Sequence, residues 1–293
     1  MPSAVIDLVL EGRPRDIGGF SVRRVLPAPM RRLVGPFIFF DHMGPAVFAP
    51  GDNGLGVRPH PHIALATITY LFDGEIVHKD SLGSDQAILP GDVNWMVAGR
   101  GIVHSERTSS DVRARGSKVH GLQTWVALPE AHEEMEPRFE HHPASSIPHL
   151  VRNGVDLRII VGTAYGAMSP VGVVSPTLYV HARMNAGAEL AVDDTHDERA
   201  LYVADGAVEC DGRIFEEGTM IVLTRGAQVD VRAARATNLM LVGGASLGGS
   251  RHIWWNFVSS SKERIEKAKA DWRAGRFPKV PGDEIEFIPL PEN

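Results

Sequence analysis

Short apolar segments separated by tight turns are the feature that most constrains the fold of this chain. Four such segments occupy residues 64–72, 75–79, 86–89 and 93–97. The residues between them are the turn-forming groups Asp73-Gly74, Leu82-Gly83-Ser84 and Pro90-Gly91-Asp92. Glycine tolerates positive φ and proline fixes φ, as hairpin connections require. Short strands at this spacing, with no helix between them, predict an antiparallel β-sandwich or barrel.

The strand pattern resumes at Leu157, continues to about Gly244, and carries a faint echo of the first half. Residues 68–74 (ITYLFDG) resemble residues 200–206 (ALYVADG). The turn signals at 90–92 and 99–101 also return, at 217–219 and 224–226. This self-similarity favours one β-unit used twice, although two unrelated β-domains with the same turn chemistry would give a similar pattern.

We expect an N-terminal domain at residues 1–138 and a C-terminal domain at residues 139–293. The stretch 139–151 is polar, with prolines and histidines, which suits a linker at the start of the second domain. Near the C-terminus, Ser260-Ser-Lys-Glu263 is a capping pattern, apolar residues follow at helical spacing, and Gly275 is a stop signal. These signals predict one amphipathic helix at about 261–274.

The composition excludes several classes of protein. The formal net charge of the 293 residues is −6, which gives no electrostatic basis for direct binding of nucleic acid or an anionic membrane. Cys210 is the single cysteine, which excludes an intramolecular disulfide and a multi-cysteine metal site. No run approaches the roughly 20 apolar residues that span a bilayer. Asp7 and Glu11 interrupt the N-terminus before a secretory core develops, so we expect a cytoplasmic protein.

Two pairs of potential metal ligands lie in the first half of the chain, at His60-Pro-His62 and His104-Ser-Glu106. Residues two apart on a strand face the same side, about 6.5–7 Å apart along the chain. Two such pairs on facing strands can converge on one point. Three imidazoles and one carboxylate suit iron, manganese, copper, nickel or zinc, and leave two positions of an octahedral ion open. We therefore predict one divalent ion bound by His60, His62, His104 and Glu106.

A single His-x-His pair is more often two polar residues on a solvated strand than a metal site. Here the second pair follows the turn at Gly99-Arg100-Gly101, so both pairs lie near loops, where sites tend to form. The second half of the chain lacks the set, which predicts one ion per chain. When the two halves are aligned on their turns, the positions that match the four ligands hold Val192, Asp194, Val229 and Val231.

Other polar residues have weaker claims to a chemical role. We expect His141 and His142 to form a solvated pair in the linker rather than a metal site. His42 is either an outer donor to the metal ligands or a satisfied polar residue near a turn. Arg100 is either a contact for an anionic substrate or, more simply, a turn arginine. Cys210 has no activating neighbour in the sequence, so we expect no redox role for it.

Six segments taken together resemble the pirins, a family of the cupin superfamily. They are 34–45 (VGPFIFFDHMGP), 58–62 (RPHPH), 90–92 (PGD), 98–106 (AGRGIVHSE), 120–125 (HGLQTW) and 251–257 (RHIWWNF). The resemblance covers nearly the whole chain. It implies an all-β bicupin, with two antiparallel β-barrel or jelly-roll domains and one C-terminal helix. It also implies one ion on His60, His62, His104 and Glu106 in the first barrel, most often Fe(II), with Mn, Ni, Cu, Co or Zn as alternatives.

The resemblance implies two functions of different kinds. One is a quercetin 2,3-dioxygenase that takes a flavonol-like substrate and dioxygen and releases carbon monoxide, with Glu106 as the base. The other is a non-enzymatic regulator whose metal and redox state control binding to a transcription factor or a metabolic enzyme. The open positions on the ion favour the enzyme, which we expect to be a monomer. Ala66 stands where pirins usually carry glutamate, which bears on the pocket wall and substrate preference.

Overall fold

The computed structural model describes residues 4–17 and 20–292, which form two compact units. The first consists of the residues up to Arg15 together with Arg23–His42 and Ser145–Leu247, and is called the 145–247 unit below. The second consists of Asp16–Val22, Met43–Ala144 and the residues from Gly248 on, and is called the 43–144 unit. Each unit is therefore assembled from separate stretches of the chain.

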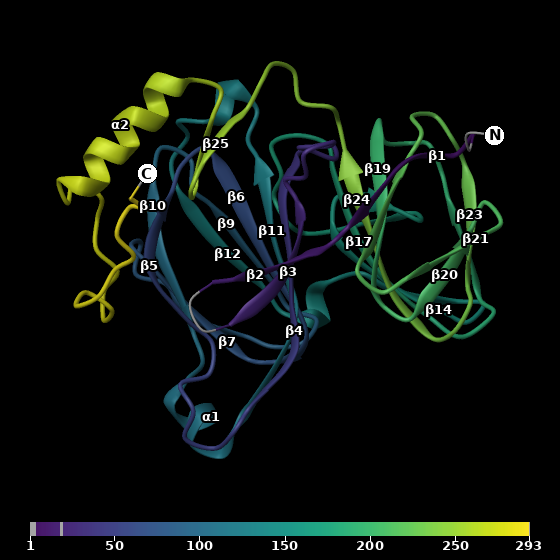
Figure 1. The fold of residues 1–293 in the computed structure, drawn as a ribbon, viewed down its shortest axis with the longest axis horizontal. Coiled ribbons are helices and arrows are strands. Elements are labelled where there is room, and N and C mark those ends of the chain that lie inside the picture. Colours follow the sequence, from purple (N-terminus) through teal and green to yellow (C-terminus); the bar gives the residue numbers. More distant parts are fainter. Residues whose placement is uncertain (1–3, 18–19, 293) are drawn as a thin grey trace. The chain divides into compact units, whose positions relative to one another are not determined.

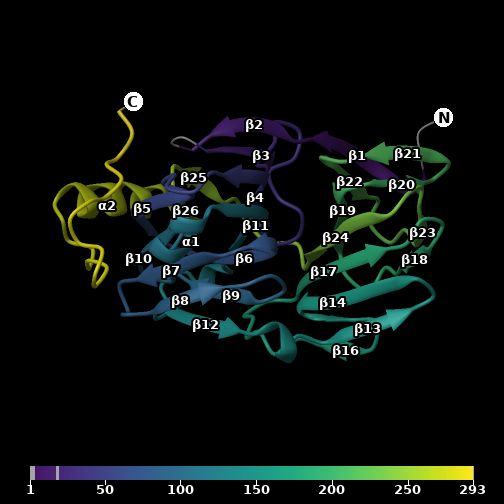
Figure 2. The ribbon, with the colours of Figure 1, turned by 90° about the horizontal axis from the view of Figure 1, so that it is seen from below.

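Strands dominate the 43–144 unit, as the spacing of turns predicted. Its strands β6 (Leu65–Gly74), β9 (Val93–Val97), β11 (Ser117–Ala127) and β12 (Arg138–His142) belong to a sheet of the order β12-β9-β6-β11-β4-β3-β2. In the other three strands, β2 (Arg13–Asp16), β3 (Ser21–Leu26) and β4 (Phe37–Phe48), the residues up to Arg15 and those in 23–42 are counted with the 145–247 unit. A second, antiparallel sheet has the order β5-β10-β7-β8, with β5 (Gly56–His62), β7 (Ile76–Asp80), β8 (Asp85–Ile88) and β10 (Ile102–Arg107). These four strands follow one another in that order in Figure 2. A hairpin, β25 (His252–Trp254) and β26 (Phe257–Ser259), precedes helix α2 (Lys262–Arg273).

The 145–247 unit repeats this plan with different side chains. Its larger sheet has the order β1-β22-β19-β24-β17-β14-β13, with β1 (Ile6–Glu11), β13 (His149–Arg152), β14 (Val155–Val161), β17 (Thr177–Met184), β19 (Glu198–Asp205), β22 (Thr219–Leu223) and β24 (Thr237–Gly244). Its four-stranded sheet has the order β18-β23-β20-β21, with β18 (Glu189–Val192), β20 (Ala207–Cys210), β21 (Arg213–Glu216) and β23 (Val229–Ala233). The short pair β15 (Thr163–Ala164) and β16 (Ala167–Met168) completes it. Within residues 4–17 and 20–292, the elements not yet named are three short helices, α1 (Ser110–Arg115), η1 (Glu130–His132) and η2 (Ala144–Ser146).

The two echoed segments occupy equivalent places in these sheets. Residues 68–74 lie in β6, and all but the last of residues 200–206 lie in β19. Each strand is the third from one edge of its seven-stranded sheet. The matching strand orders confirm the expectation of one β-unit used twice. In the 145–247 unit, the interior is a cluster of fully buried aliphatic side chains that includes Ile159, Val180 and Leu239.

The two units do not follow the expected boundary between residues 138 and 139. The N-terminal strand β1 pairs with β22, and it therefore belongs to the 145–247 unit. Helix α2 lies within the predicted range 261–274, but it belongs to the 43–144 unit, since Ile265 and Ala268 pack with Phe257 and Ile63. Figure 1 shows α2 at the side of this unit where β5 and β10 lie. The expected linker begins as a strand, because β12 pairs with β9 along its length. Contacts between segments distant in sequence decide these boundaries, and composition does not show them.

No helix within residues 4–17 and 20–292 combines the length and apolar character that crossing a membrane would require.

The turn before β10 gives the first prediction. Gly99 has φ of +49°, and a Cβ added there would lie 2.0 Å from the Met135 carbonyl oxygen, whereas Gly83 has φ of +95° and nothing within 4 Å. We expect Gly83→Ala to lower the free energy of unfolding by about 1–2 kcal/mol, the cost of positive φ alone. Gly99→Ala should cost about 2 kcal/mol more, because the backbone must also move. Equal losses in chemical denaturation would contradict this reading of the turn.

Candidate metal centre

The predicted ligands lie on two neighbouring strands, β5 and β10. These strands pair antiparallel, with His104 opposite His60 and Ile102 opposite His62. Residues directly opposite each other in a pair project from the same face of the sheet. The register shifts between His104 and Glu106, which is typical of a β-bulge that changes the direction of a side chain.

Three of the four predicted ligands meet. His60, His62 and His104 each offer one ring nitrogen, these atoms lie within 4.8 Å of one another, and all three residues are buried. The Nε2 atoms of His62 and His104 are 3.1 Å apart. Among the residues that the structure describes, this is the one group of three or more metal-binding side chains so arranged.

Backbone carbonyls fix the orientation of two of these imidazoles. His60 donates from Nδ1 to the carbonyl of Arg58 at 2.9 Å, and His62 donates from Nδ1 to the carbonyl of Asn256 at 3.0 Å. A carbonyl only accepts, so in the neutral ring the proton lies on Nδ1 and Nε2 carries a lone pair. The lone pairs of buried imidazoles that face one another lack a donor, and a cation would satisfy them.

Burial also sets the charge of the three rings. Desolvation lowers the pKa of His60 to about 4 and holds the pKa values of His62 and His104 well below the usual range. The neighbouring imidazoles lower the pKa of His62 and His104 further. The rings are therefore neutral at pH 7, which is the form that binds metal ions.

Glu106 is placed differently from the histidines. Its carboxylate does not belong to the set of mutually close ligand atoms. It accepts a hydrogen bond from the Thr69 hydroxyl at 3.1 Å, and that hydroxyl also lies 2.8 Å from Oε1 of Gln123. Burial raises the pKa of Glu106, which favours its acting as a proton acceptor near neutral pH.

Sequence reasoning missed a second polar pair beside the centre, His78 and Asp80 on β7. The pairing of β7 with β10 puts Asp80 opposite His104 and His78 opposite Glu106. Nδ1 of His78 lies 3.4 Å from Nδ1 of His104, and Nε2 of His78 lies 3.0 Å from Oδ2 of Asp80. Burial alone would raise the pKa of Asp80, but hydrogen bonds from His78 and Ser84 lower it below its ordinary value. The signal was available, since His-x-Asp has the same two-residue spacing as the ligand pairs.

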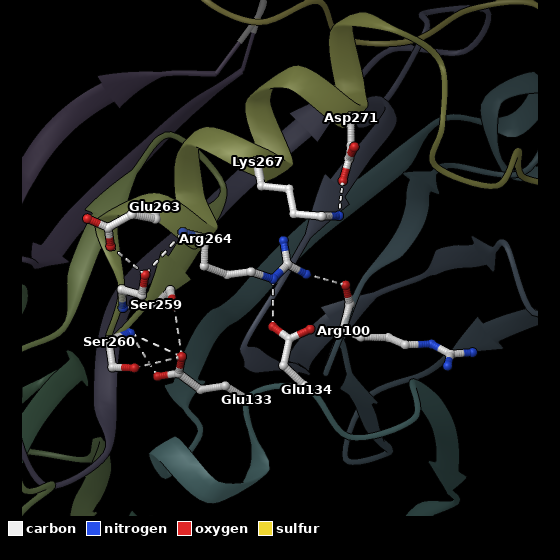
Figure 3. Close-up of polar contacts among 10 residues, drawn as sticks. Arg100, Glu133, Glu134, Ser259, Ser260, Glu263, Arg264, Lys267 and Asp271 are labelled. Carbon is white, nitrogen blue, oxygen red and sulfur yellow. Dashed lines mark hydrogen bonds and ion pairs between the residues drawn. The ribbon is translucent and has the colours of Figure 1, made fainter.

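A second missed contribution comes from the C-terminal hairpin, whose turn supplies the Asn256 carbonyl. This hairpin is fixed by Glu133, which pairs with Arg251 at 3.3 Å with both side chains buried. Figure 3 shows the same carboxylate accepting hydrogen bonds from Ser259 and Ser260. The next residue, Glu134, pairs instead with Arg264 of α2 and is exposed (Figure 3).

Comparison with known proteins identifies the family. Two family models match the chain, Pirin over residues 19–126 and the Pirin C-terminal cupin domain over residues 179–278. A pirin-like protein of Caulobacter vibrioides is 51% identical over 290 residues, which covers 98% of this chain and 100% of the relative. The chain belongs to the pirin family.

The names of two further proteins similar to this pirin include an enzymatic activity. A Pseudomonas aeruginosa protein, whose name gives quercetin 2,3-dioxygenase as a proposed activity, is 36% identical over 94% of this chain and 87% of its own length. A solved structure of a quercetin 2,3-dioxygenase from Acinetobacter baumannii superposes with a TM-score of 0.90 at 31% identity, covering 98% of this chain and 95% of that one. The all-β bicupin fold with a C-terminal helix, which the resemblance implied, is confirmed.

The residues with weaker claims to a chemical role lie in ordinary structural surroundings in this pirin. Nδ1 of His141 bonds to Asn94, and Nε2 of His142 bonds to Glu140, both on β12 rather than in a solvated linker. His42 bonds to the Tyr202 hydroxyl at 2.8 Å, as a satisfied polar residue. Arg100 forms an exposed ion pair with Glu136. Burial raises the pKa of Cys210 to about 11. Ala66 is fully buried on β6.

The contrast between the two neighbouring glutamates gives the second prediction. Glu133→Gln should lower the free energy of unfolding by about 3 kcal/mol, because it leaves the buried Arg251 guanidinium without a charged partner. Glu134→Gln removes an exposed pair and should cost less than about 1 kcal/mol. Chemical denaturation of both variants measures the difference. A loss of similar size for both would show that the buried pair does not fix the hairpin.

Proposed function

We propose that this pirin is a metal-dependent dioxygenase that opens flavonols of the quercetin type. The observation that carries the proposal is the convergence of three buried, neutral imidazoles beside an acidic residue on one of the same strands. The names of the Pseudomonas relative and of the Acinetobacter structure support the same reaction. In this reaction dioxygen adds across the heterocycle of the flavonol, the ring opens to an ester, and one carbon leaves as carbon monoxide.

The donor set fits a divalent metal ion. His60, His62 and His104 would hold the ion through Nε2, since their Nδ1 atoms face away toward other partners. Glu106 would supply the fourth ligand from the same strand as His104. Nitrogen and oxygen donors of this kind suit Fe(II), which we propose as the native ion, and also accept Mn, Ni, Cu, Co or Zn. When bound, such an ion supplies a Lewis acid for the substrate oxygen and an electron-transfer partner for dioxygen.

Glu106 is the proposed base. The flavonol must lose the proton of its 3-hydroxyl group before the ring can react, and the Glu106 carboxylate would accept that proton. Its environment suits this task, because burial raises its pKa and Thr69 fixes the carboxylate by a hydrogen bond to Oε1. The three histidines are themselves buried, so bulk water has little access to the proposed ligands.

Turnover of quercetin gives the third prediction. Protein loaded anaerobically with Fe(II) should consume quercetin in air and release one carbon monoxide per flavonol. Glu106→Gln should lower turnover by about 100-fold or more while iron is still measurable in the protein, since it removes the general base. His62→Ala should lose both iron and turnover, whereas His142→Ala, a matched histidine outside the centre, should keep both.

Metal content measured on the same samples decides the interpretation. Full iron occupancy without loss of the flavonol absorbance would contradict the dioxygenase and leave a metal-binding protein. Equal turnover with and without a chelator would contradict the metal dependence itself.

A further inference from the structure

The metal centre continues outward through a line of three side chains, from His104 through His78 to Asp80. Building on the proposed metal site, we propose that Asp80 acts through His78 to fix the proton of His104 on Nδ1, so that Nε2 of His104 faces the centre as a lone pair. Asp80 and His78 are then positioning residues, which contact neither metal nor substrate. They thereby select which of its two neutral tautomers the His104 ring adopts.

The outer end of the line is fixed by the backbone. Oδ1 of Asp80 accepts hydrogen bonds from the amides of Leu82 at 2.9 Å and Ser84 at 3.1 Å. Oδ2 lies 3.0 Å from Nε2 of His78, and Asp80 is completely buried. An ionised carboxylate only accepts, so Nε2 of His78 must be the donor in this contact.

His78, in the middle of the line, determines where the proton of His104 lies. In the neutral form of His78, which the inference requires, one nitrogen donates and the other accepts, so that donation from Nε2 leaves a lone pair on Nδ1. That atom lies 3.4 Å from Nδ1 of His104, which must therefore carry the proton between them. The ring of His78 stacks on Phe139 with centroids 4.3 Å apart and planes at 6°, which restricts its rotation.

The opposite arrangement of protons would prevent His62 and His104 from acting together as metal ligands. If His78 donated to His104, the proton of His104 would lie on Nε2, only 3.1 Å from Nε2 of His62. His62 already donates from Nδ1 to Asn256, so its Nε2 would accept that proton in a hydrogen bond. The two imidazoles would then satisfy each other and present no pair of ligands to an ion. The carboxylate of Asp80 excludes this state.

Asp80→Asn reverses the polarity of the line with almost no change in shape. The asparagine oxygen stays with the two backbone amides, because the NH2 group cannot accept from them. The NH2 group then faces His78 and donates to Nε2, which moves the His78 proton to Nδ1 and the His104 proton to Nε2. Asp85→Asn is the matched control, since it removes one carboxylate from the neighbouring strand β8 but at an exposed position paired with Lys79.

The tautomers can be read directly by 15N NMR of histidine-labelled, metal-free protein at pH 8, where protonated and bare ring nitrogens give separate signals. We expect the His104 proton on Nδ1 in the wild type and in Asp85→Asn, and on Nε2 in Asp80→Asn. Titration with Co(II), followed by its visible absorption, should show a ten- to hundredfold loss of affinity in Asp80→Asn alone. The same tautomer in all three proteins, or a His78 ring protonated on both nitrogens in the wild type, would overturn the inference.

A second variant covers the case in which Asp80→Asn does not fold. His78→Phe keeps the stacked ring against Phe139 but removes the acceptor for His104, so the His104 proton should again move to Nε2. Retention of the Nδ1 proton in that variant would also overturn the inference. The spectra need no metal, so a wild type that binds no Co(II) would count against the proposed metal site and leave the assignment of tautomers to be judged by the spectra.

Discussion

The register between β5 and β10 is the constraint on which the candidate centre depends. His104 lies opposite His60 in this antiparallel pair, and a slip of one residue would turn one strand's side chains to the other face. The turn at Gly99 positions β10 for this pairing, and the pairing of β7 with β10 extends the polar cluster to His78 and Asp80. The proposed ligands, the His78–Asp80 pair and the proposed base therefore all follow from one arrangement of strands.

The same arrangement exists in the 145–247 unit without these side chains. There β18 pairs with β23 so that Val192 lies opposite Val229, the counterparts of His60 and His104 in the sequence alignment of the two halves. That unit fills the equivalent region with aliphatic residues, including Val231. The fold therefore does not require metal-binding side chains at this place, and the polar centre of the 43–144 unit is an addition to it.

Local periodicity explains what could be predicted from the sequence. Strands, turns and the terminal helix have short-range signals, and the spacing of two residues brings His60 and His62 to one face of β5. The same rule would have found His78 and Asp80. The carbonyl of Asn256 had no such signal, because any residue has a carbonyl and the contact spans 194 positions. The unit boundaries were missed for the same reason, since the ends of the chain join units by long-range pairing.

The most direct test of the account is anomalous diffraction from crystals of the protein loaded with Fe(II) or Mn(II). The account predicts a single ion, with Nε2 of His60, His62 and His104 at about 2.0–2.3 Å, in the range typical of metal–imidazole bonds. It also predicts that Glu106 turns its carboxylate toward the ion. An ion held elsewhere, for example by His141 and His142, or rings that remain without an ion at full loading, would contradict it.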